Sequence, residues 1–404
     1  MEKSRKPKIR FKGFTDDWEQ RKLGELVQFS KGNGYSKRDL EEVGTPIILY
    51  GRLYTNYETV ISDVDTYVCA KSGSVYSRGG EVIVPASGET SEDISIASVV
   101  EKPGFLLGGD LNIITPSIQL DSVFLAISIS NGKPHNVMAK MAQGKSVVHL
   151  HNSDLEKIDL LFPEHDEQAR ISSCIRGIDY LITLHQRKLE KLMNVKKSML
   201  EKMFPKRGSD VPEIRFFGFT DAWEQRKFRE LYSKSGEKND GSIGINKNIT
   251  VATMQFKGDV KVSTPEYLKT YYTFNLGDIA FEGHQSKEFR YGRFVENDIG
   301  NGIVSHIFSV FRPVQEYDLH FWKYAINNEE LMQNILSRST KASTMMHDLV
   351  TDDFLNETFL VPSLSEQEKV GSILHNLDNL ITLHQRKLEK LKNIKKSMLE
   401  KMFI

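Results

Sequence analysis

The sequence predicts an α+β protein in which two similar globular domains are joined by two long helices that form an antiparallel coiled coil. The main observation is a duplication: Leu181–Phe204 and Leu380–Phe403 differ at only two of 24 aligned positions. A shorter repeat opens each half of the chain, and a variable globular stretch follows it. The predicted boundaries are 1–163 for an N-terminal arm and first globular domain, 164–205 for the first long helix, 206–213 for a linker, 214–362 for the second globular domain, and 363–404 for the second long helix.

The apolar residues of the duplicated segment recur at alternating steps of four and three residues, which is the heptad seam of a coiled coil. Each seam contains one histidine and, further along, one lysine (Lys196 or Lys395). We interpret the histidines as seam residues rather than metal ligands, because no second ligand follows at helical spacing. The central members of the two seams are Ile178, Ile182, His185, Leu189 and Leu192 in the first copy and Leu377, Ile381, His384, Leu388 and Leu391 in the second.

Each long helix has signals for its start and its end. Asp166 and Ser365 are the predicted N-cap residues, and Ser365 with Glu368 forms a potential capping box. Pro205 is expected to end the first helix. Each helix is then about 40 residues, or roughly 60 Å, long. A helix of this length needs a partner for its apolar stripe, and the other copy is the simplest one.

Connectivity favours an antiparallel pair. The second globular domain follows the first helix and leads into the second helix. If the second helix starts where the first one ends, that domain lies at one end of the pair and the first domain at the other. In a parallel pair the second domain would have to return along the whole length of the helices.

The shorter repeat, Ile9–Leu26 and Ile214–Leu231, agrees at 14 of 18 positions. Its tryptophans, Trp18 and Trp223, are predicted to anchor each globular domain on the helices. The variable stretches, about 27–162 and 232–361, share landmarks that are 197 residues apart: Gly80–Val84 with Gly277–Phe281, Pro116 with Pro313, and Asp121 with Asp318. We infer one α+β scaffold that carries two different surfaces.

The chain has 54 basic and 54 acidic residues, which counts against a nucleic-acid binder that acts alone. The basic residues concentrate in the repeated helix, however: Arg187–Arg207 holds eight basic residues against two acidic ones, and Arg386–Lys401 holds seven against two. Such a face is either simply solvated or contacts phosphate or an acidic protein surface, and the sequence leaves both interpretations open.

Several features indicate a cytoplasmic protein that does not enter a membrane. The two cysteines, Cys69 and Cys174, have neither zinc-site spacing nor the number expected of a disulfide scaffold, which fits a reducing compartment. The charged N-terminus does not resemble a signal peptide. No apolar run approaches the roughly 18 residues of a membrane span.

Catalytic signatures are mostly absent. Residues 142–146 resemble the end of a phosphate-binding loop, but Ala139 stands where the motif requires glycine. No Asn-Pro-Pro-aromatic or Asp-Pro-Pro-Tyr tetrad for amino methylation of a base is present. Asp278, Glu282 and Lys287 are the nearest approach to a nuclease cluster, but a strand end and its loop is the favoured interpretation. We therefore predict no catalytic, cofactor-binding or metal-binding residue in this chain.

Polar loops carry the remaining candidate chemistry. One loop follows the matched strand in each domain and another precedes the last strand, and hydroxyl, amide, Arg and Lys groups are those that contact base edges and phosphates. The alternative is that these loops are polar only because they are exposed. The predicted DNA-contacting residues are Ser87, Glu89, Thr90, Lys145 and Ser146 in the first domain and His284, Gln285, Lys287, Arg290, Arg293, Ser339, Thr340 and Lys341 in the second, with Arg52, Tyr54 and Arg78 as an alternative surface.

With these features, the chain closely resembles a type I restriction-modification specificity subunit. The residues that carry the resemblance are the F/V-P-x-x-x-x-Q segments Phe162–Gln168 and Val361–Gln367, the two Trp-Glu-Gln-Arg-Lys segments, the duplicated helices and the two divergent domains. The resemblance implies two target recognition domains, each reading one half of a split double-stranded DNA sequence, with the helix pair setting the gap.

The resemblance also implies partners. Two modification subunits are expected to methylate adenine with S-adenosylmethionine, and two ATP-driven restriction subunits are expected to join for cleavage, so that S-adenosylmethionine, ATP and Mg²⁺ belong to the partners and this chain is not catalytic. The alternatives are a self-sufficient DNA methyltransferase or endonuclease, or a coiled-coil tether with protein-binding heads. The bases of the target do not follow from the sequence.

Overall fold

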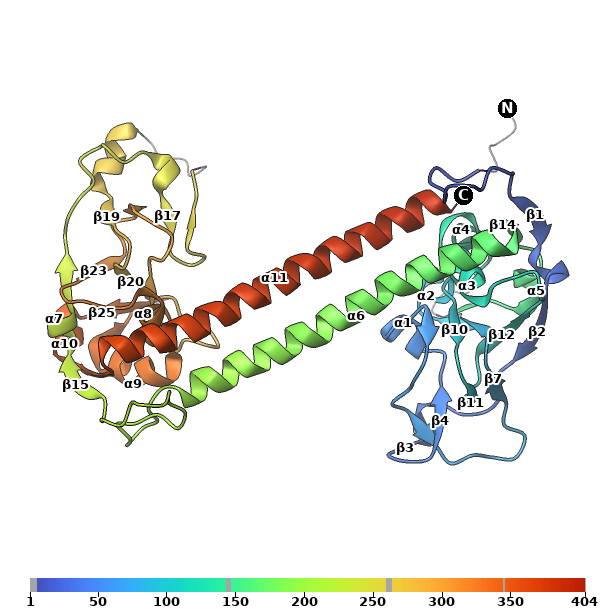
Figure 1. Ribbon diagram of the computed structural model, residues 1–404, viewed down its shortest axis with the longest axis horizontal. Coiled ribbons are helices and arrows are strands. Elements are labelled where there is room, and N and C mark those ends of the chain that lie inside the picture. The colour runs from blue at the N-terminus through green and yellow to red at the C-terminus, as the bar shows by residue number, and fades with distance from the viewer. Residues whose placement is uncertain (1–5, 143–146, 259–263, 344–345, 404) are drawn as a thin grey trace. The chain divides into compact units, whose positions relative to one another are not determined.

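The computed structural model describes residues 6–142, 147–258, 264–343 and 346–403. The chain divides into two compact units, Met1–Gln186 with Arg386–Ile404 and Arg187–Gln385. Each unit therefore contains one globular region and one half of each long helix (Figure 1). The predicted fold class, two similar α+β regions joined by two long paired helices, is confirmed. Among the described residues, no helix is both long and apolar enough to cross a membrane.

The first unit is built on two five-stranded sheets with the strand orders β2-β12-β8-β10-β5 and β3-β6-β4-β11-β7, and on the two-stranded pairs β1-β14 and β9-β13. Most neighbours are antiparallel, whereas β5 is parallel to β10 and β4 is parallel to β11. The strands are β1 (Glu19–Lys22), β2 (Val27–Lys31), β3 (Leu40–Glu41), β4 (Thr45–Ile48), β5 (Val60–Ile61), β6 (Tyr67–Val68), β7 (Tyr76–Arg78), β8 (Glu81–Pro85), β9 (Ser87–Gly88), β10 (Ser98–Val100), β11 (Pro103–Leu107), β12 (Leu111–Pro116), β13 (Val148–His149) and β14 (Asp159–Phe162). The helices before the first long helix are α1 (Arg52–Thr55), α2 (Ser91–Ile94), α3 (Ser122–Ser130), α4 (Gly132–Met141) and α5 (Asn152–Leu155), with 3-10 turns η1 (Leu23–Glu25) and η2 (Lys37–Asp39).

The second unit has one four-stranded antiparallel sheet with the order β16-β23-β20-β21, surrounded by the pairs β15-β26, β17-β18, β19-β22 and β24-β25. Its strands are β15 (Glu224–Lys227), β16 (Tyr232–Ser235), β17 (Ile249–Thr250), β18 (Gln255–Phe256), β19 (Tyr272–Phe274), β20 (Ile279–Glu282), β21 (Arg293–Glu296), β22 (Gly302–Val304), β23 (Ser309–Pro313), β24 (Thr340–Ala342), β25 (His347–Leu349) and β26 (Thr358–Val361). Its helices before the second long helix are α7 (Phe228–Leu231), α8 (Leu319–Ile326), α9 (Glu329–Ser339) and α10 (Thr351–Asn356), with 3-10 turns η3 (Ile245–Lys247) and η4 (Pro265–Thr270).

The two globular regions share a scaffold, as the constant spacing of landmarks predicts. In the first, Val99 of β10 pairs with Val82 of β8. In the second, Glu296 of β21 pairs with Ile279 of β20. Glu296 lies 197 residues after Val99, and Ile279 lies 197 residues after Val82. The N-caps also match, because Asp121 and Asp318 accept hydrogen bonds from the N–H groups three residues later, at the starts of α3 and α8. The second five-stranded sheet of the first unit has no five-stranded equivalent among the described residues of the second.

The long helices are α6 (His165–Lys202) and α11 (Leu364–Met402), of 38 and 39 residues. Their length is confirmed, but the predicted N-caps are wrong by two residues. The carbonyl groups of Glu164 and Ser363 already accept hydrogen bonds from the N–H groups of Gln168 and Gln367. Asp166 and Ser365 therefore lie inside the first turn, and the capping box of Ser365 does not form because that residue is already helical.

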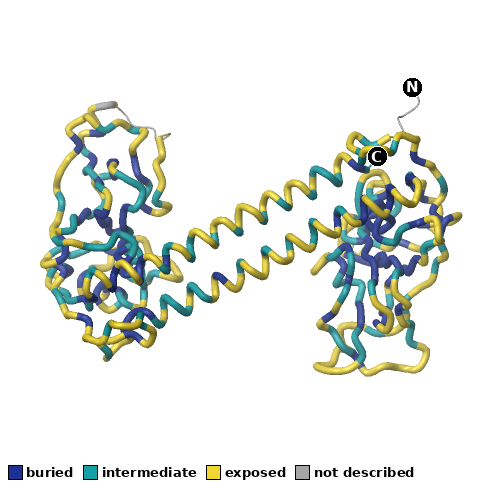
Figure 2. The backbone as a smooth tube through the Cα atoms, in the orientation of Figure 1, coloured by how far each residue is buried: buried dark blue, intermediate teal, exposed yellow. Residues whose placement is uncertain are grey.

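The predicted seam positions are the less exposed ones along the middle of both long helices. Between residues 181 and 192 of α6, only Ile182, His185, Leu189 and Leu192 are buried or half-buried, and the other positions are exposed. The same holds for their four counterparts between residues 380 and 391 of α11 (Figure 2). Ile178 and Leu377, one step earlier, are half-buried as well. The alternation of exposed and half-buried positions along both helices follows the predicted heptad period.

The seam lysines pair with an aspartate of the opposite helix within each unit. In the first unit Lys395 of α11 lies 2.5 Å from Asp179 of α6, and in the second Lys196 of α6 lies 2.6 Å from Asp378 of α11. The same carboxylates also bind the globular regions, because Asp179 accepts a hydrogen bond from Thr59 and Asp378 accepts one from Tyr324. In both units the N-terminal half of one helix thus lies beside the C-terminal half of the other, which makes the pairing antiparallel.

Trp18 and Trp223 anchor each globular region on the end of a long helix, as predicted. Trp18 packs edge-on against Phe403, which follows α11, with the ring centroids 6.3 Å apart. Trp223 packs in the same way against Phe204, which follows α6, at 6.0 Å. Both tryptophans are buried, so the end of each duplicated segment forms part of the core of one unit.

The F/V-P-x-x-x-x-Q segments have a structural explanation that is the same in both units. Gln168 accepts a hydrogen bond from the N–H of Asp121 and donates to the carbonyl of Pro163. Gln367 does the same with Asp318 and Pro362. This buried glutamine ties the start of the long helix to the residue that caps α3 or α8, so the motif maintains the fold rather than contacting a ligand.

Candidate nucleic-acid interface

The two polar loops predicted for the second unit are adjacent in the structure. After β20, Gly283 accepts a backbone hydrogen bond of 2.8 Å from the N–H of His347, and His284 pairs with Met346 in an antiparallel bridge. A Cβ atom at position 283 would lie 2.1 Å from the carbonyl oxygen of His347, so only glycine permits this approach. The loop after the matched strand and the loop before the last strand therefore form one surface.

The first unit brings its loops together at matching positions. Ser87 of β9 pairs with His149 of β13. These two residues lie 197 positions before His284 and Met346, the pair that joins the loops of the second unit. Lys145 and Ser146, which belong to the second of these loops, lie outside the described residues.

In the second unit, five of the predicted residues are exposed. Lys287 and Lys341 present their ammonium groups to solvent, and the guanidinium group of Arg290 lies 5.5 Å from the ring of Tyr291. An arginine placed over an aromatic ring keeps its hydrogen-bond donors available. The exposed set is His284, Gln285, Lys287, Arg290 and Lys341.

The other predicted residues of the second unit have structural roles. Arg293 donates to the carboxylate of Glu282 at 2.8 Å and also to the carbonyl of Ala252. Ser339 is fully buried at the end of α9, where its hydroxyl donates to Ile335, so it has no surface to present to DNA. Thr340 is half-buried and donates to the carbonyl of Leu336. The contacts of Ser339 and Thr340 depend on where α9 ends, and those of Arg293 depend on the pairing of β20 with β21, so the prediction did not anticipate them.

In the first unit, Glu89 is exposed and Thr90 is the N-cap of α2, where its hydroxyl accepts a hydrogen bond from Asp93. Ser87 is buried, which removes it from the exposed surface. Tyr54 lies near this loop: burial raises the pKa of its phenol, and the nearby charges of Asp93 and Glu89 raise it further. Glu89 and Thr90, with the half-buried Tyr54 beside them, are thus the described parts of the predicted surface that remain accessible here.

In the alternative surface of Arg52, Tyr54 and Arg78, the guanidinium group of Arg52 is already held by ion pairs. Arg52 forms ion pairs with Glu58 at 2.7 Å and Asp65 at 3.1 Å, and only 14% of its side chain is exposed. Arg78 is exposed, but it precedes the start of β8, whereas the candidate loop follows the end of that strand. Arg52 is therefore structural, and Arg78 lies away from the loop that contains Glu89.

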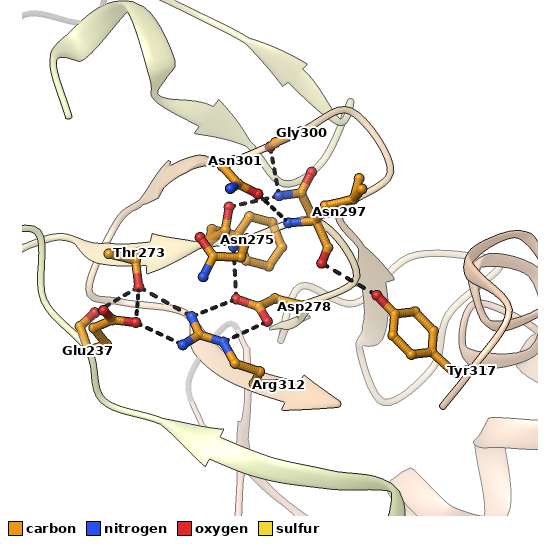
Figure 3. Close-up of polar contacts among 11 residues, drawn as sticks. Glu237, Thr273, Asn275, Asp278, Asn297, Gly300, Asn301, Arg312 and Tyr317 are labelled. Atoms are coloured by element: carbon orange, nitrogen blue, oxygen red, sulfur yellow. Dashed lines mark hydrogen bonds and ion pairs between the residues drawn. The ribbon is translucent and has the colours of Figure 1, made fainter. Parts of the chain in front are cut away.

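The acidic residues that resembled a nuclease cluster are neutralised by arginines. Asp278 is buried and forms an ion pair with Arg312 at 3.1 Å, and Arg312 also binds Glu237 at 2.8 Å (Figure 3). Burial raises the pKa of Asp278, and the hydrogen bond from Arg312 opposes that rise. Among the described residues, no group of three or more His, Cys, Asp or Glu side chains is placed to hold a metal ion.

Sequence reasoning missed His347 and Tyr291. His347 is 8% exposed, and its ring nitrogens Nε2 and Nδ1 lie 2.5 Å from Gln285 Nε2 and 3.3 Å from Thr340 Oγ1. The ring of Tyr291 packs edge-on against it, with centroids 5.4 Å apart. An isolated histidine in a short strand carries no distinctive sequence signal, although its position one residue after the loop-joining Met346 could have drawn attention to it.

These features define a class of protein: a duplicated α+β chain that presents two different polar loop surfaces at matching places on one scaffold. The family described as "Type I restriction modification DNA specificity domain" matches residues 15–194 and 221–393. The chain belongs to this family and is a specificity subunit of the type I restriction-modification kind. The match falls on both halves, as the duplication requires.

Known relatives agree with this assignment. The chain is 21% identical over 407 residues to the type I restriction enzyme MjaVIII specificity subunit of Methanocaldococcus jannaschii, covering 95% of this chain and 91% of that protein. It is 23% identical over 208 residues to the putative MjaX specificity subunit of the same organism, covering 47% and 46%. The crystal structure of a type I restriction-modification system S subunit from M. genitalium has the same fold, with a TM-score of 0.63, 13% identity and 99% of both chains covered.

Proposed function

We propose that each unit of this chain reads one half of a bipartite double-stranded DNA target and that the paired helices α6 and α11 set the length of the gap. The observation that carries this proposal is the difference between the two loop surfaces on a matched scaffold. Where the first unit presents Glu89 and Tyr54, the second presents Gln285, Arg290 and Lys341. A duplicated scaffold with different side chains at its loops is suited to reading two different sequences.

The exposed side chains suit distinct contacts. Arg290 is suited by its chemistry to pair with guanine and Glu89 to accept from the amino group of cytosine, each contact worth roughly 1–3 kcal/mol of discrimination against a wrong base. Lys341 and Lys287 are suited to phosphate oxygens, which contribute affinity without sequence information. The neutral net charge of the chain is compatible with this function if partner subunits supply part of the phosphate-binding surface.

The duplicated helices support binding of two copies of each partner. Each unit has a groove beside the same repeated residues, of about 750 Å³ in the second unit and 610 Å³ in the first. The groove in the second unit is lined by Lys196, Lys197, Leu200 and Glu201, and that in the first by their counterparts Lys395, Lys396, Leu399 and Glu400. Each helix also exposes a leucine pair outside the seam, Leu181 with Leu184 and Leu380 with Leu383.

A surface presented twice suits two identical partners. We therefore propose two methyltransferase subunits and two restriction subunits as the partners of this chain. S-adenosylmethionine, ATP and Mg²⁺ are used in those subunits, and the complex acts in the cytoplasm. In this assignment the chain itself contributes recognition and assembly.

Exchanging the second variable region tests the half-site assignment. Replacement of residues 232–361 by the equivalent region of another specificity subunit is expected to change one half of the methylated motif and leave the other half and the gap unaltered. The motif is determined by sequencing methylated bases in cells that carry the system. The reciprocal exchange of residues 27–162 is the control and should change only the other half. A change in both halves, or in neither, contradicts the proposal.

A methyl-transfer assay tests the division of labour between subunits. The purified chain, incubated with labelled S-adenosylmethionine and target DNA, is expected to transfer no label until a methyltransferase subunit is added. Mg²⁺-dependent cleavage is not expected either, because Asp278 and Glu282 are each bound to an arginine, Arg312 and Arg293. Turnover by the chain alone, or Mg²⁺-dependent cleavage by it, would instead establish a self-sufficient enzyme.

A further inference from the structure

We propose that His347 and Thr340 are positioning residues that fix the orientation of the Gln285 side-chain amide. The second unit then selects, at one position of its half-site, a base that carries an amino group in the major groove over a base that carries a carbonyl there. This inference rests on the proposed DNA-reading function and specifies the chemistry of one contact within it.

The donors and acceptors of this cluster can be assigned in order from the backbone outward. The carbonyl of Leu336 can only accept, so the Thr340 hydroxyl, 2.7 Å away, donates its hydrogen to it. The oxygen of Thr340 must then accept from His347 Nδ1, at 3.3 Å, which places the imidazole hydrogen on Nδ1. His347 Nε2 is left as an acceptor, and the amide nitrogen of Gln285, 2.5 Å away, donates to it.

The support behind Gln285 is buried and held on several sides. Leu336 lies in the core of the second unit, and the imidazole of His347 packs against the ring of Tyr291. The backbone of His347 is also bound to Gly283, two residues before the glutamine. Gln285 itself is exposed, so a chain of hydrogen bonds through the half-buried Thr340 and the buried His347 ends in one accessible amide.

This arrangement fixes which end of the amide faces outward. Rotating the amide by half a turn would set its oxygen against the lone pair of His347 Nε2. Moving the imidazole hydrogen to Nε2 would remove this repulsion, but Nδ1 would then need a hydrogen from Thr340, and that hydrogen is already donated to Leu336. Gln285 Oε1 is therefore the outward acceptor. It suits the amino group of adenine N6 or cytosine N4, whereas guanine O6 and thymine O4 are acceptors themselves and could use only the one amide hydrogen that does not bind His347. An unsupported glutamine rotates freely and serves either kind of base.

Binding measurements on the full chain in complex with its methyltransferase subunit test this inference. The DNA panel consists of duplexes in which each base pair of the second half-site is replaced in turn. At one position the wild-type complex should prefer adenine or cytosine over guanine or thymine by on the order of ten- to a hundred-fold. Gln285→Ala should abolish the preference at that same position.

Variants of the positioning residues supply the decisive comparison. Thr340→Val removes the hydroxyl, and His347→Phe keeps a ring against Tyr291 but removes both nitrogens. Each should reduce the preference to a few-fold at the Gln285 position and leave the other positions unaltered. Thr340→Ser retains the hydroxyl and should restore the wild-type preference. Combining Thr340→Val with Gln285→Ala should add nothing to the effect of Gln285→Ala at this position.

The outcomes separate this inference from the function on which it rests. If Thr340→Val keeps the full preference, or weakens binding to all duplexes equally, the positioning role is refuted. If Gln285→Ala alters no position while exchange of residues 232–361 still changes the motif, the inference fails and half-site reading stands. If that exchange leaves the motif unchanged, the proposed function fails as well.

Discussion

Replacing Arg215 by methionine is expected to destabilise the second unit by about 3–5 kcal/mol, because it leaves the carboxylate of Glu366 buried without a cation. Arg215 donates two hydrogen bonds to Glu366, of 2.8 and 2.7 Å, in a bidentate pair. The side chain of Glu366 is only 2% exposed. The pair joins the segment before β15 to the first turn of α11, so its loss should loosen the junction between the globular region and the helix.

The first unit provides a matched control within the same molecule. Arg10 and Glu167 form the equivalent pair, with distances of 2.8 and 2.7 Å and a fully buried glutamate. Hydrogen exchange should therefore accelerate at β15 and the first turn of α11 in Arg215→Met but remain unchanged at β1 and the first turn of α6. Changing Glu366 to Gln in the same chain should recover most of the loss, since it removes the uncompensated charge. Equal exchange in Arg215→Met and wild type would show that the pair contributes nothing.

The paired helices were predictable because a long duplicated heptad has few other ways to bury its apolar stripe. The residues that pair with the seam lysines were not predictable. That Lys196 pairs with Asp378 depends on the register of the antiparallel pair, and the heptad pattern of one helix does not specify the residues opposite it. The predicted starts of the two long helices were also wrong. Asp166 and Ser365 are good capping residues, but each helix already begins at the residue after Glu164 or Ser363.

The candidate site was predictable as a pair of loops but not as a set of side chains. The shared scaffold brings the two predicted segments of the second unit together, although the segment before β25 consists of the end of α9 and strand β24 rather than a loop. The direction of each side chain depends on its immediate neighbours. Ser339 and Ser87 point into the protein and Arg293 is bound to Glu282, whereas Gln285 and Arg290 point outward. Polar character is the same in both groups, so it could not separate them.

Glu296 is a buried acidic residue of the second unit. It lies in β21, opposite Ile279 of β20, and only 3% of it is exposed. Among the described residues, neither of its carboxylate oxygens has a hydrogen-bond partner. Burial raises the pKa of Glu296 well above its usual value, the charge of Asp298 raises it further, and Lys323 opposes the rise. The group is therefore neutral in the folded protein at pH values where it is ionised in the unfolded chain.

This difference makes the second unit less stable as the pH rises. Above about pH 4.5, the usual pKa of a glutamate, the unfolded chain releases a proton that the folded chain keeps. The free energy of unfolding then falls by about 1.4 kcal/mol per pH unit until the pH passes the pKa of the folded state. Glu296→Gln cannot ionise, so it should match the wild type near pH 4.5 and exceed it in stability at neutral and alkaline pH.

The repeated scaffold supplies a reciprocal test of the same prediction. Val99 of β10, 4% exposed, occupies in the first unit the place that Glu296 occupies in the second, opposite Val82. Glu296→Val should therefore abolish the pH dependence in the second unit, while Val99→Glu should introduce it in the first. Urea unfolding at a series of pH values, followed by tryptophan fluorescence, measures both effects. Parallel stability curves for wild type and Glu296→Gln from about pH 4.5 to pH 8 would show that Glu296 ionises equally in the folded and unfolded states.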